Sequence, residues 1–294
     1  MNAPLGLVLG YAADRLLGDP ARFHPVAGFG RAAAALERVT YADRRGHGVV
    51  HVAVLVGAAA ALGRSGVPVA LATWAVLGGR SLDREAAAVE ELLRSGDLGA
   101  ARIRLTHLVG RDTTTLDEGE IARAVIESLA ENTSDAVVAP LVWGALAGAP
   151  GLLTYRAANT LDAMVGHRNA RYERFGWAAA RLDDLLNLPG SRLTAGLAVA
   201  LGDDRAGAVR AWRRDAGGHP SPNAGPVEAA FAGALGIRLG GVNVYGDRVE
   251  DRQVLGDGRA PTQHDITRAR LLARRVGLGA LAVVVPIALL RRRR

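Results

Sequence analysis

Residues 49–79 read VVHVAVLVGAAAALGRSGVPVALATWAVLGG and form the longest apolar stretch of the chain. A single helix would place Arg64 near the middle of a bilayer, where an unpaired charge costs about 2.5–3.5 kcal/mol. Two helices joined at the Gly63–Gly66 break avoid this cost, and Pro68 favours the same break. Both flanks are rich in arginine, so the positive-inside rule places both in the cytoplasm. The stretch therefore predicts a membrane hairpin, shallow or tilted.

Three further apolar stretches follow. Residues 136–153 carry no charge and approach the minimum spanning length, with Pro140 and Pro150 expected to kink the helix. Residues 193–202 are too short to span and predict a buried or interfacial helix. Residues 276–290 precede Arg291–Arg294, and this basic end predicts a cytoplasmic C-terminus.

Amphipathic segments lie between the apolar stretches. Residues 81–94 have apolar positions at helical spacing, and Thr115–Glu118 predicts a capping box that opens a helix to Ala130. The sequence contains no internal repeat or long linker, so we expect one integral membrane domain over residues 1–294. The predicted fold class is all-α: a polytopic protein of the cytoplasmic (inner) membrane, with amphipathic helical loops in the cytoplasm.

Composition narrows the chemistry. The 294 residues are 49% hydrophobic but only 4% aromatic, and the mean hydropathy is +0.13. Cysteine is absent, which excludes disulfides, thiolate metal sites and cysteine nucleophiles. Lysine is absent too, which excludes a Walker or Schiff-base lysine. The net charge is +7, but the basic residues form no compact stretch interleaved with aromatic residues. We therefore expect the positive charge to contact anionic lipids and phosphorylated substrates, and not nucleic acid.

Polar residues gather at both ends of residues 136–153. Glu127 and Glu131 share a helix face, and Asn132 and Asp135 follow, a set of oxygen atoms that suits Mg²⁺. A solvated acidic face is the alternative, which the position of Asp135 beside an uncharged stretch weakens. At the other end, Asn159 and Asp162 lie three residues apart, and a helix cap or loop is the alternative there.

A second acidic motif lies in residues 183–187. Asp183 and Asp184 stand four and three residues before Asn187, so all three can point toward one metal, although a solvated helix face is also compatible. Other candidates lie in segments that could equally be plain turns. These are Arg111 and Asp112 in residues 110–113, His24 after Gly18-Asp19-Pro20, and Ser221 and Asn223 in residues 219–225.

Taken in the order in which they occur along the chain, these motifs resemble those of the adenosylcobinamide-phosphate synthase family of cobalamin biosynthesis. The likeness is carried by residues 18–25, 109–113, 127–141, 159–162, 180–187 and 221–225. It implies an amide-bond-forming ligase that joins a propionate carboxylate of adenosylcobyric acid to aminopropanol or aminopropanol O-phosphate. Such a condensation is uphill in water, so we infer ATP and Mg²⁺ as cofactors, although the chain carries no recognised ATP motif.

On this hypothesis the candidate residues divide into three groups. Expected catalytic residues are Asp112, Glu127, Glu131 and Asp135. Expected metal ligands are Glu131, Asp183 and Asp184. Expected substrate contacts are His24, Arg111, Asn132, Asn159, Asp162, Arg181, Asn187, Ser221 and Asn223. Expected partners are the corrinoid, the amino alcohol or its phosphate, and the lipid bilayer; a homo-oligomer and an association with other cobalamin-pathway membrane enzymes both stay open.

The main alternative is a membrane Mg²⁺-dependent prenyl- or phosphotransferase. It would use residues 183–187 to hold a Mg²⁺–diphosphate, and it would need a second Asp-rich motif and several full spans. The nearest second motif is Asn159-x-x-Asp162, which is meagre. A membrane scaffold or transporter subunit would place polar groups within its spans, whereas here they lie at boundaries and in loops. We therefore favour the synthase.

Overall fold

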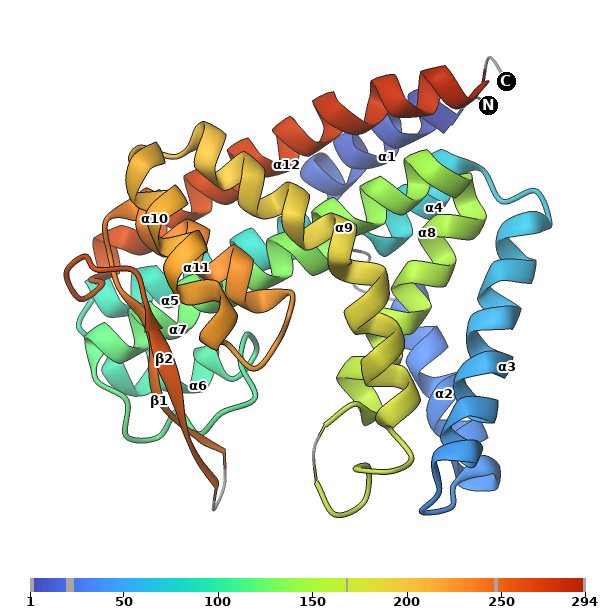
Figure 1. Cartoon of the computed structure of the whole chain (residues 1–294), viewed down its shortest axis with the longest axis horizontal. Helices are drawn as coiled ribbons and strands as arrows, with labels where there is room; N and C mark the ends of the chain where they lie inside the picture. Colours follow the sequence, from blue (N-terminus) through green and yellow to red (C-terminus); the bar gives the residue numbers. More distant parts are fainter. Residues whose placement is uncertain (1–2, 20–23, 168, 246–247, 293–294) are drawn as a thin grey trace. The chain divides into compact units, whose positions relative to one another are not determined.

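The computed structural model describes residues 3–19, 24–167, 169–245 and 248–292. The chain is mostly helical, and it divides into two compact units (Figure 1). Unit 1 comprises Met1–Arg80, Asp135–Gly190 and Leu281–Arg294, and unit 2 comprises Ser81–Ser134 and Ser191–Ala280. The single domain over residues 1–294 stays a prediction. Pro20 of the first motif and the last two arginines lie outside the described residues.

Unit 1 is built on packed helices. They are α1 (Ala3–Leu17), α2 (Pro25–Thr40), α3 (Arg45–Arg64), α4 (Val69–Val76), the π-helical turn η1 (Ser134–Val138), α8 (Ala139–Val165), the first part of α9 (Trp177–Leu201) and the end of α12 (Gln263–Arg292). Helix α1 packs on α4, and α3 packs on α8. Gly10 permits the first contact, because a Cβ there would collide with Thr73. Leu161 and Phe175 lie at the centre of a core formed by α2, α3, α8 and α9.

Unit 2 contains shorter helices and one β-hairpin. Its elements are α5 (Gly79–Arg94), α6 (Leu98–Leu105), α7 (Glu118–Thr133), α10 (Arg205–Asp215), the 3-10 turn η2 (Ala216–Gly218), α11 (Ala224–Leu235), β1 (Leu239–Tyr245), β2 (Arg248–Leu255) and the first part of α12. Every residue of α11 is buried. Strands β1 and β2 pair antiparallel, with Asn243 opposite Glu250. The all-α prediction is therefore wrong for this segment, in which Val242 and Val244 stand two residues apart before Gly246-Asp247 in the sequence.

The predicted break in residues 49–79 is confirmed. Helix α3 ends at Arg64 and α4 begins at Val69, directly after Pro68. However, α4 has eight residues, about 12 Å of helix, which is too short to span a bilayer. Among the described residues, three helical segments are long and apolar enough to cross a membrane: Arg45–Arg64, Glu118–Val165 and Gln263–Arg291. They suggest a membrane protein.

Three local predictions need correction. Pro140 does not kink a helix interior, because it lies in the first turn of α8, where its missing N–H is tolerated. The kink expected at Pro150 is present, and it falls two residues earlier at Gly148, whose φ of 63° and ψ of −145° interrupt α8. The capping box on α7 is formed by Asp117 and Glu120 rather than by Thr115 and Glu118. Residues 193–202 are not a separate helix, since they lie almost entirely within the C-terminal part of α9.

Candidate functional site

Unit 1 brings together four side chains that the sequence analysis selected. Asp135 comes from η1, Asn159 from α8, and Asp183 and Asn187 from α9. Asn159 Nδ2 donates to Asp135 Oδ2 at 3.4 Å and to Asp183 Oδ1 at 3.3 Å. Asn187 Nδ2 donates to Asp135 Oδ1 at 2.5 Å. These four residues, which we term the carboxylate–amide cluster, thus place two carboxylates around one bridging amide.

Local backbone features place these side chains. Asp135 lies in the π-helical turn between α7 and α8, and such turns are frequent at functional sites because the extra residue changes the direction of a side chain. Asp183 and Asn187 are one helical turn apart on α9, and both are buried. One turn further, Gly190 lies against the start of α8, where a Cβ would collide with Ala139. The close approach of α9 to α8 therefore depends on glycine.

Arg156 links the cluster to the rest of α8. Its Nη1 donates to Asn159 Oδ1 at 3.2 Å, and its charge interacts with those of Asp19, Asp135 and Asp183. This contact holds the Asn159 oxygen, so the Asn159 amide nitrogen faces the two carboxylates. Arg156 belongs to the predicted motif of residues 156–162 but was not among the candidate site residues.

The donor set of the cluster fits a hard cation. Carboxylate and amide oxygens are the ligands of Mg²⁺, which usually takes one or two protein carboxylates and completes its shell with water and substrate phosphate. Within the described ranges, no three His, Asp or Glu side chains group in a way that could hold a metal by themselves. The cluster therefore fits a magnesium ion that shares its ligands with a substrate, rather than one enclosed by protein.

The other predicted residues of unit 1 have separate contacts. Arg181 Nη1 lies 3.4 Å from Asp184 Oδ2, and the Arg181 side chain is largely exposed. Asp162 lies one turn beyond Asn159 on α8, next to Gly166. His24 caps α2, since its Nδ1 accepts from Val26 N at 3.2 Å, and its Nε2 lies 3.8 Å from Asp19 Oδ2.

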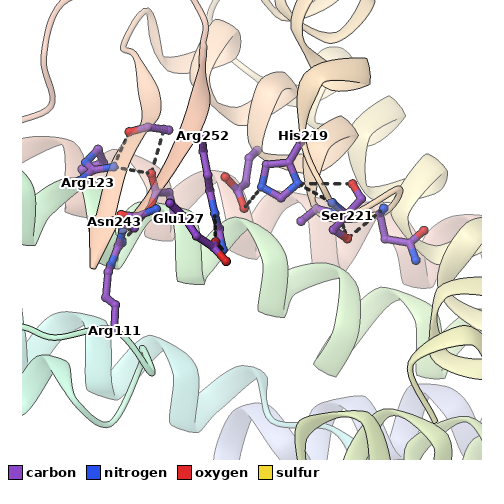
Figure 2. A network of polar contacts seen from close by, with 12 residues as sticks. Arg111, Arg123, Glu127, His219, Ser221, Asn243 and Arg252 are labelled. Atoms are coloured by element: carbon purple, nitrogen blue, oxygen red, sulfur yellow. Dashed lines mark hydrogen bonds and ion pairs between the residues drawn. The ribbon is translucent and has the colours of Figure 1, made fainter. Parts of the chain in front are cut away.

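Unit 2 contains a buried ionic network at the base of the hairpin (Figure 2). Arg111 Nη2 donates to Glu127 Oε2 at 2.6 Å, and Arg111 also donates to Asn243 of β1. The second oxygen of Glu127 accepts from Gly240 N at 2.9 Å and lies 3.5 Å from Arg123 Nη1. The network joins α7 to β1, so Arg111 and Glu127 have a structural role whatever else they do.

A second buried pair lies beside this network. His219 Nδ1 accepts from Ser221 N at 3.1 Å, and His219 Nε2 is 3.8 Å from Glu228 Oε1 (Figure 2). Burial, with the nearby charges of Glu127 and Glu131, raises the pKa of Glu228 well above its ordinary value. Burial and Arg252 lower the pKa of His219. Both shifts favour the neutral form of the group concerned.

The remaining predicted residues of unit 2 make local contacts. Asp112 is exposed and accepts from Thr114 N, which forms a turn. Asn132 donates to Ser128 O. Ser221 Oγ accepts from Ala224 N at the start of α11, and Asn223 Oδ1 accepts from Ser191 Oγ. Glu131 is exposed on α7 and belongs to unit 2, whereas its predicted co-ligands Asp183 and Asp184 belong to unit 1.

Comparison with known proteins decides the family. The profile of the CobD/Cbib protein family matches residues 7–273. The chain belongs to this family. It is 52% identical to the cobalamin biosynthesis protein CobD of Mycobacterium tuberculosis H37Rv, an alignment that covers 98% of this chain and 96% of the relative. It is 48% identical to CobD of Chromobacterium violaceum, in an alignment that covers 94% of this chain and 93% of the relative. It is 42% identical to CobD of Rhodobacter capsulatus, in an alignment that covers 99% of each chain.

The resemblance inferred from the ordered motifs is thus confirmed at the level of the CobD/Cbib family. No solved structure matches the chain. Sequence reasoning missed Arg123, His219, Glu228 and Arg252 as members of the polar network in unit 2. A signal existed for Glu228, because it is the one charged residue in the apolar helix of residues 224–235. Arg123 and Arg252 lack such a signal, since charges on amphipathic elements usually face solvent.

Proposed function

We propose that this chain acts in cobalamin biosynthesis as an adenosylcobinamide-phosphate synthase-like ligase. It would form an amide between a propionate carboxylate of adenosylcobyric acid and aminopropanol or aminopropanol O-phosphate. Membership of the CobD/Cbib family supports the pathway, since the curated relatives carry the name cobalamin biosynthesis protein. The observation that best supports the reaction is the carboxylate–amide cluster, because three separate family motifs contribute to it.

Amide formation from a carboxylate and an amine needs an activated acid, and ATP is the simplest activator. Bound Mg²⁺ would supply charge neutralisation at the phosphate oxygens. Asp183 is the carboxylate that would hold it, as the sequence analysis expected. The amides of Asn159 and Asn187 can present either an oxygen or an N–H to this position, because rotation about the terminal torsion exchanges the two. Arg156 holds the Asn159 oxygen, so in this structure Asn159 presents its N–H to the carboxylates.

The attacking amine must lose a proton, and four carboxylates were predicted as catalytic. Asp135 is the best placed, because it lies within the cluster and accepts hydrogen bonds from two amides. Glu127 is engaged by Arg111 and by Gly240 N, Asp112 is exposed in a turn, and Glu131 is exposed on α7. We therefore assign the proton acceptor to Asp135. For Arg111 to contact a phosphate or propionate, its pair with Glu127 would have to open.

The proposed location is the cytoplasmic membrane, with several spans, and with the loops and C-terminus in the cytoplasm. Three helical segments of sufficient length and apolarity support membrane insertion, and the Arg-rich flanks of α3 and the arginines at the C-terminus support the orientation. Proposed partners are the corrinoid, the amino alcohol or its phosphate and the bilayer, with a homo-oligomer or other membrane enzymes of the pathway still open.

The test is an assay of detergent-purified protein with adenosylcobyric acid, aminopropanol phosphate, ATP and Mg²⁺, with the product followed by mass. We expect an ATP-dependent amide-linked corrinoid. Asp135→Asn and Asp183→Asn should each lower turnover at least about 100-fold, the loss typical of disturbed metal or catalytic groups. Asp43→Asn is the matched control, because its side chain is 55% exposed and lies outside the predicted motifs, and it should retain turnover.

Two outcomes would change the assignment. Wild-type turnover in both Glu131→Gln and Asp184→Asn would remove these residues from the metal site and leave the cluster as its only candidate. Absence of corrinoid binding to the wild-type protein would overturn the synthase proposal and favour the Mg²⁺-dependent transferase.

A further inference from the structure

Unit 1 contains an apolar cavity of about 270 Å³, bounded by α2, α3, α4 and α8. Its wall is almost wholly hydrocarbon and includes Phe29, Leu55, Leu62, Val76 and Leu153. Leu55 and Val76 are buried in the protein, so they mark the inner part of the cavity. Leu62 is 57% exposed, so the cavity reaches the outer surface of α3.

Among the side-chain polar atoms of the cavity-wall residues in the described part of the chain, one buried atom, Arg156 Nε, is without a hydrogen-bond partner, and it could offer a water molecule a single contact. Thr160 Oγ1 donates to Arg156 O at 2.7 Å within α8. The guanidinium of Arg156 donates to Asn159 Oδ1, and the side chain of Arg156 contributes to the wall. A water molecule needs two to four polar partners, and an apolar cavity instead stays dry or takes up hydrocarbon. The chemistry of the wall therefore selects an apolar occupant.

The position and size of the cavity identify that occupant. Helix α3 is one of the segments with the length and apolarity to cross a membrane, and its Val54 and Leu62 are exposed. If a cavity of about 150 Å³ holds one benzene ring, a cavity of this size holds on the order of ten carbon atoms. It is thus too small for a corrinoid, but it suits the end of a single acyl chain.

We propose that the end of a membrane-lipid acyl chain enters this cavity from the surface of α3 and reaches Leu55 and Val76. The chain end would also contact the side chain of Arg156, which orients Asn159 of the carboxylate–amide cluster. The site is thus a lipid site in unit 1, and it exists whether or not the proposed ligase reaction is correct.

Photolabelling tests this directly. The full-length protein is reconstituted in phosphatidylcholine vesicles in which one acyl chain carries a terminal diazirine, illuminated, and mapped by peptide mass spectrometry. We expect labels on the buried residues Leu55 and Val76 as well as on exposed side chains of α3. Labels confined to exposed side chains would mean lipid at the surface only and would overturn the proposal. The assay requires no turnover, so its failure is separate from failure of the proposed reaction.

Two variants on α3 sharpen the test. Ala59→Phe places a ring in the cavity and should abolish labelling of Leu55 and Val76. Ala53→Phe makes the same change at an exposed position outside the cavity wall and should preserve it. Equal labelling of the buried residues in Ala59→Phe and wild type would overturn the proposal. The wild-type map decides the question alone if Ala59→Phe does not fold.

Discussion

Arg111→Met should destabilise the protein by about 3 kcal/mol, because it leaves the buried carboxylate of Glu127 short of a cation. The side chains of Arg111 and Glu127 are 5% and 10% exposed, and loss of one partner of such a pair costs about 3–5 kcal/mol. Two features reduce the cost. Glu127 keeps the Gly240 N–H and the Arg123 charge, and within the described part of the chain Arg111 Nε has no hydrogen-bond partner to lose. One feature raises it, since Asn243 also loses a donor.

The assay is chemical unfolding of the purified protein in one detergent, followed by circular dichroism. Arg210→Met is the control, because the Arg210–Asp204 pair is 60% and 51% exposed and should contribute less than about 1 kcal/mol. The double variant Arg111→Met/Glu127→Met should cost less than the sum of its single variants by more than about 1 kcal/mol. Additive single effects, or equal effects of Arg111→Met and Arg210→Met, would refute the reasoning.

Two further predictions concern carboxyl groups with raised pKa values. Burial raises the pKa of Asp14 from 3.8 to about 6. Between these pH values the folded state binds more protons than the unfolded state. The wild-type protein should therefore lose about 3 kcal/mol of unfolding free energy as pH rises through this window. Asp14→Asn should remove this part of the pH dependence, and unfolding curves of both proteins at pH 4 and 7 measure the difference. Because burial raises the pKa of Glu228 and so favours its neutral form, Glu228→Gln should cost less than about 1 kcal/mol at pH 7. A cost as large as that of Arg111→Met would show that Glu228 is charged.

Helical periodicity predicted part of the carboxylate–amide cluster. The four-residue spacing of Asp183 and Asn187 places them on one face of α9, and the structure confirms this. Their meeting with Asp135 and Asn159 could not be derived in the same way. It depends on the π-helical turn at Asp135 and on the close packing of α9 against α8 at Gly190, and neither has a distinctive signal in a single sequence.

The same periodicity was less informative for α7. It correctly placed Glu127 and Glu131 on one helix, but it did not reveal what covers each residue. Glu127 is buried because the β-hairpin and Arg111 cover it, whereas Glu131 is exposed. The hairpin was missed because its strand signal is weak. Val242 and Val244 stand two residues apart, but Val249 and Val254 on the other strand are five residues apart. Without the hairpin, a shared metal site for the two glutamates was a reasonable expectation.

Helix α8 contributes residues both to the apolar cavity and to the carboxylate–amide cluster. Arg156 and Asn159 are three residues apart, so they lie on neighbouring faces of the helix. One face turns Arg156 and Thr160 toward the cavity wall, and the next turns Asn159 toward Asp135 and Asp183. Arg156 belongs to both, because its aliphatic part lines the cavity while its guanidinium holds the Asn159 oxygen. We therefore expect a change in the packing of the cavity to act on the amide that bridges the two carboxylates. Turnover of apolar variants along α3, measured beside their stability, tests this expectation.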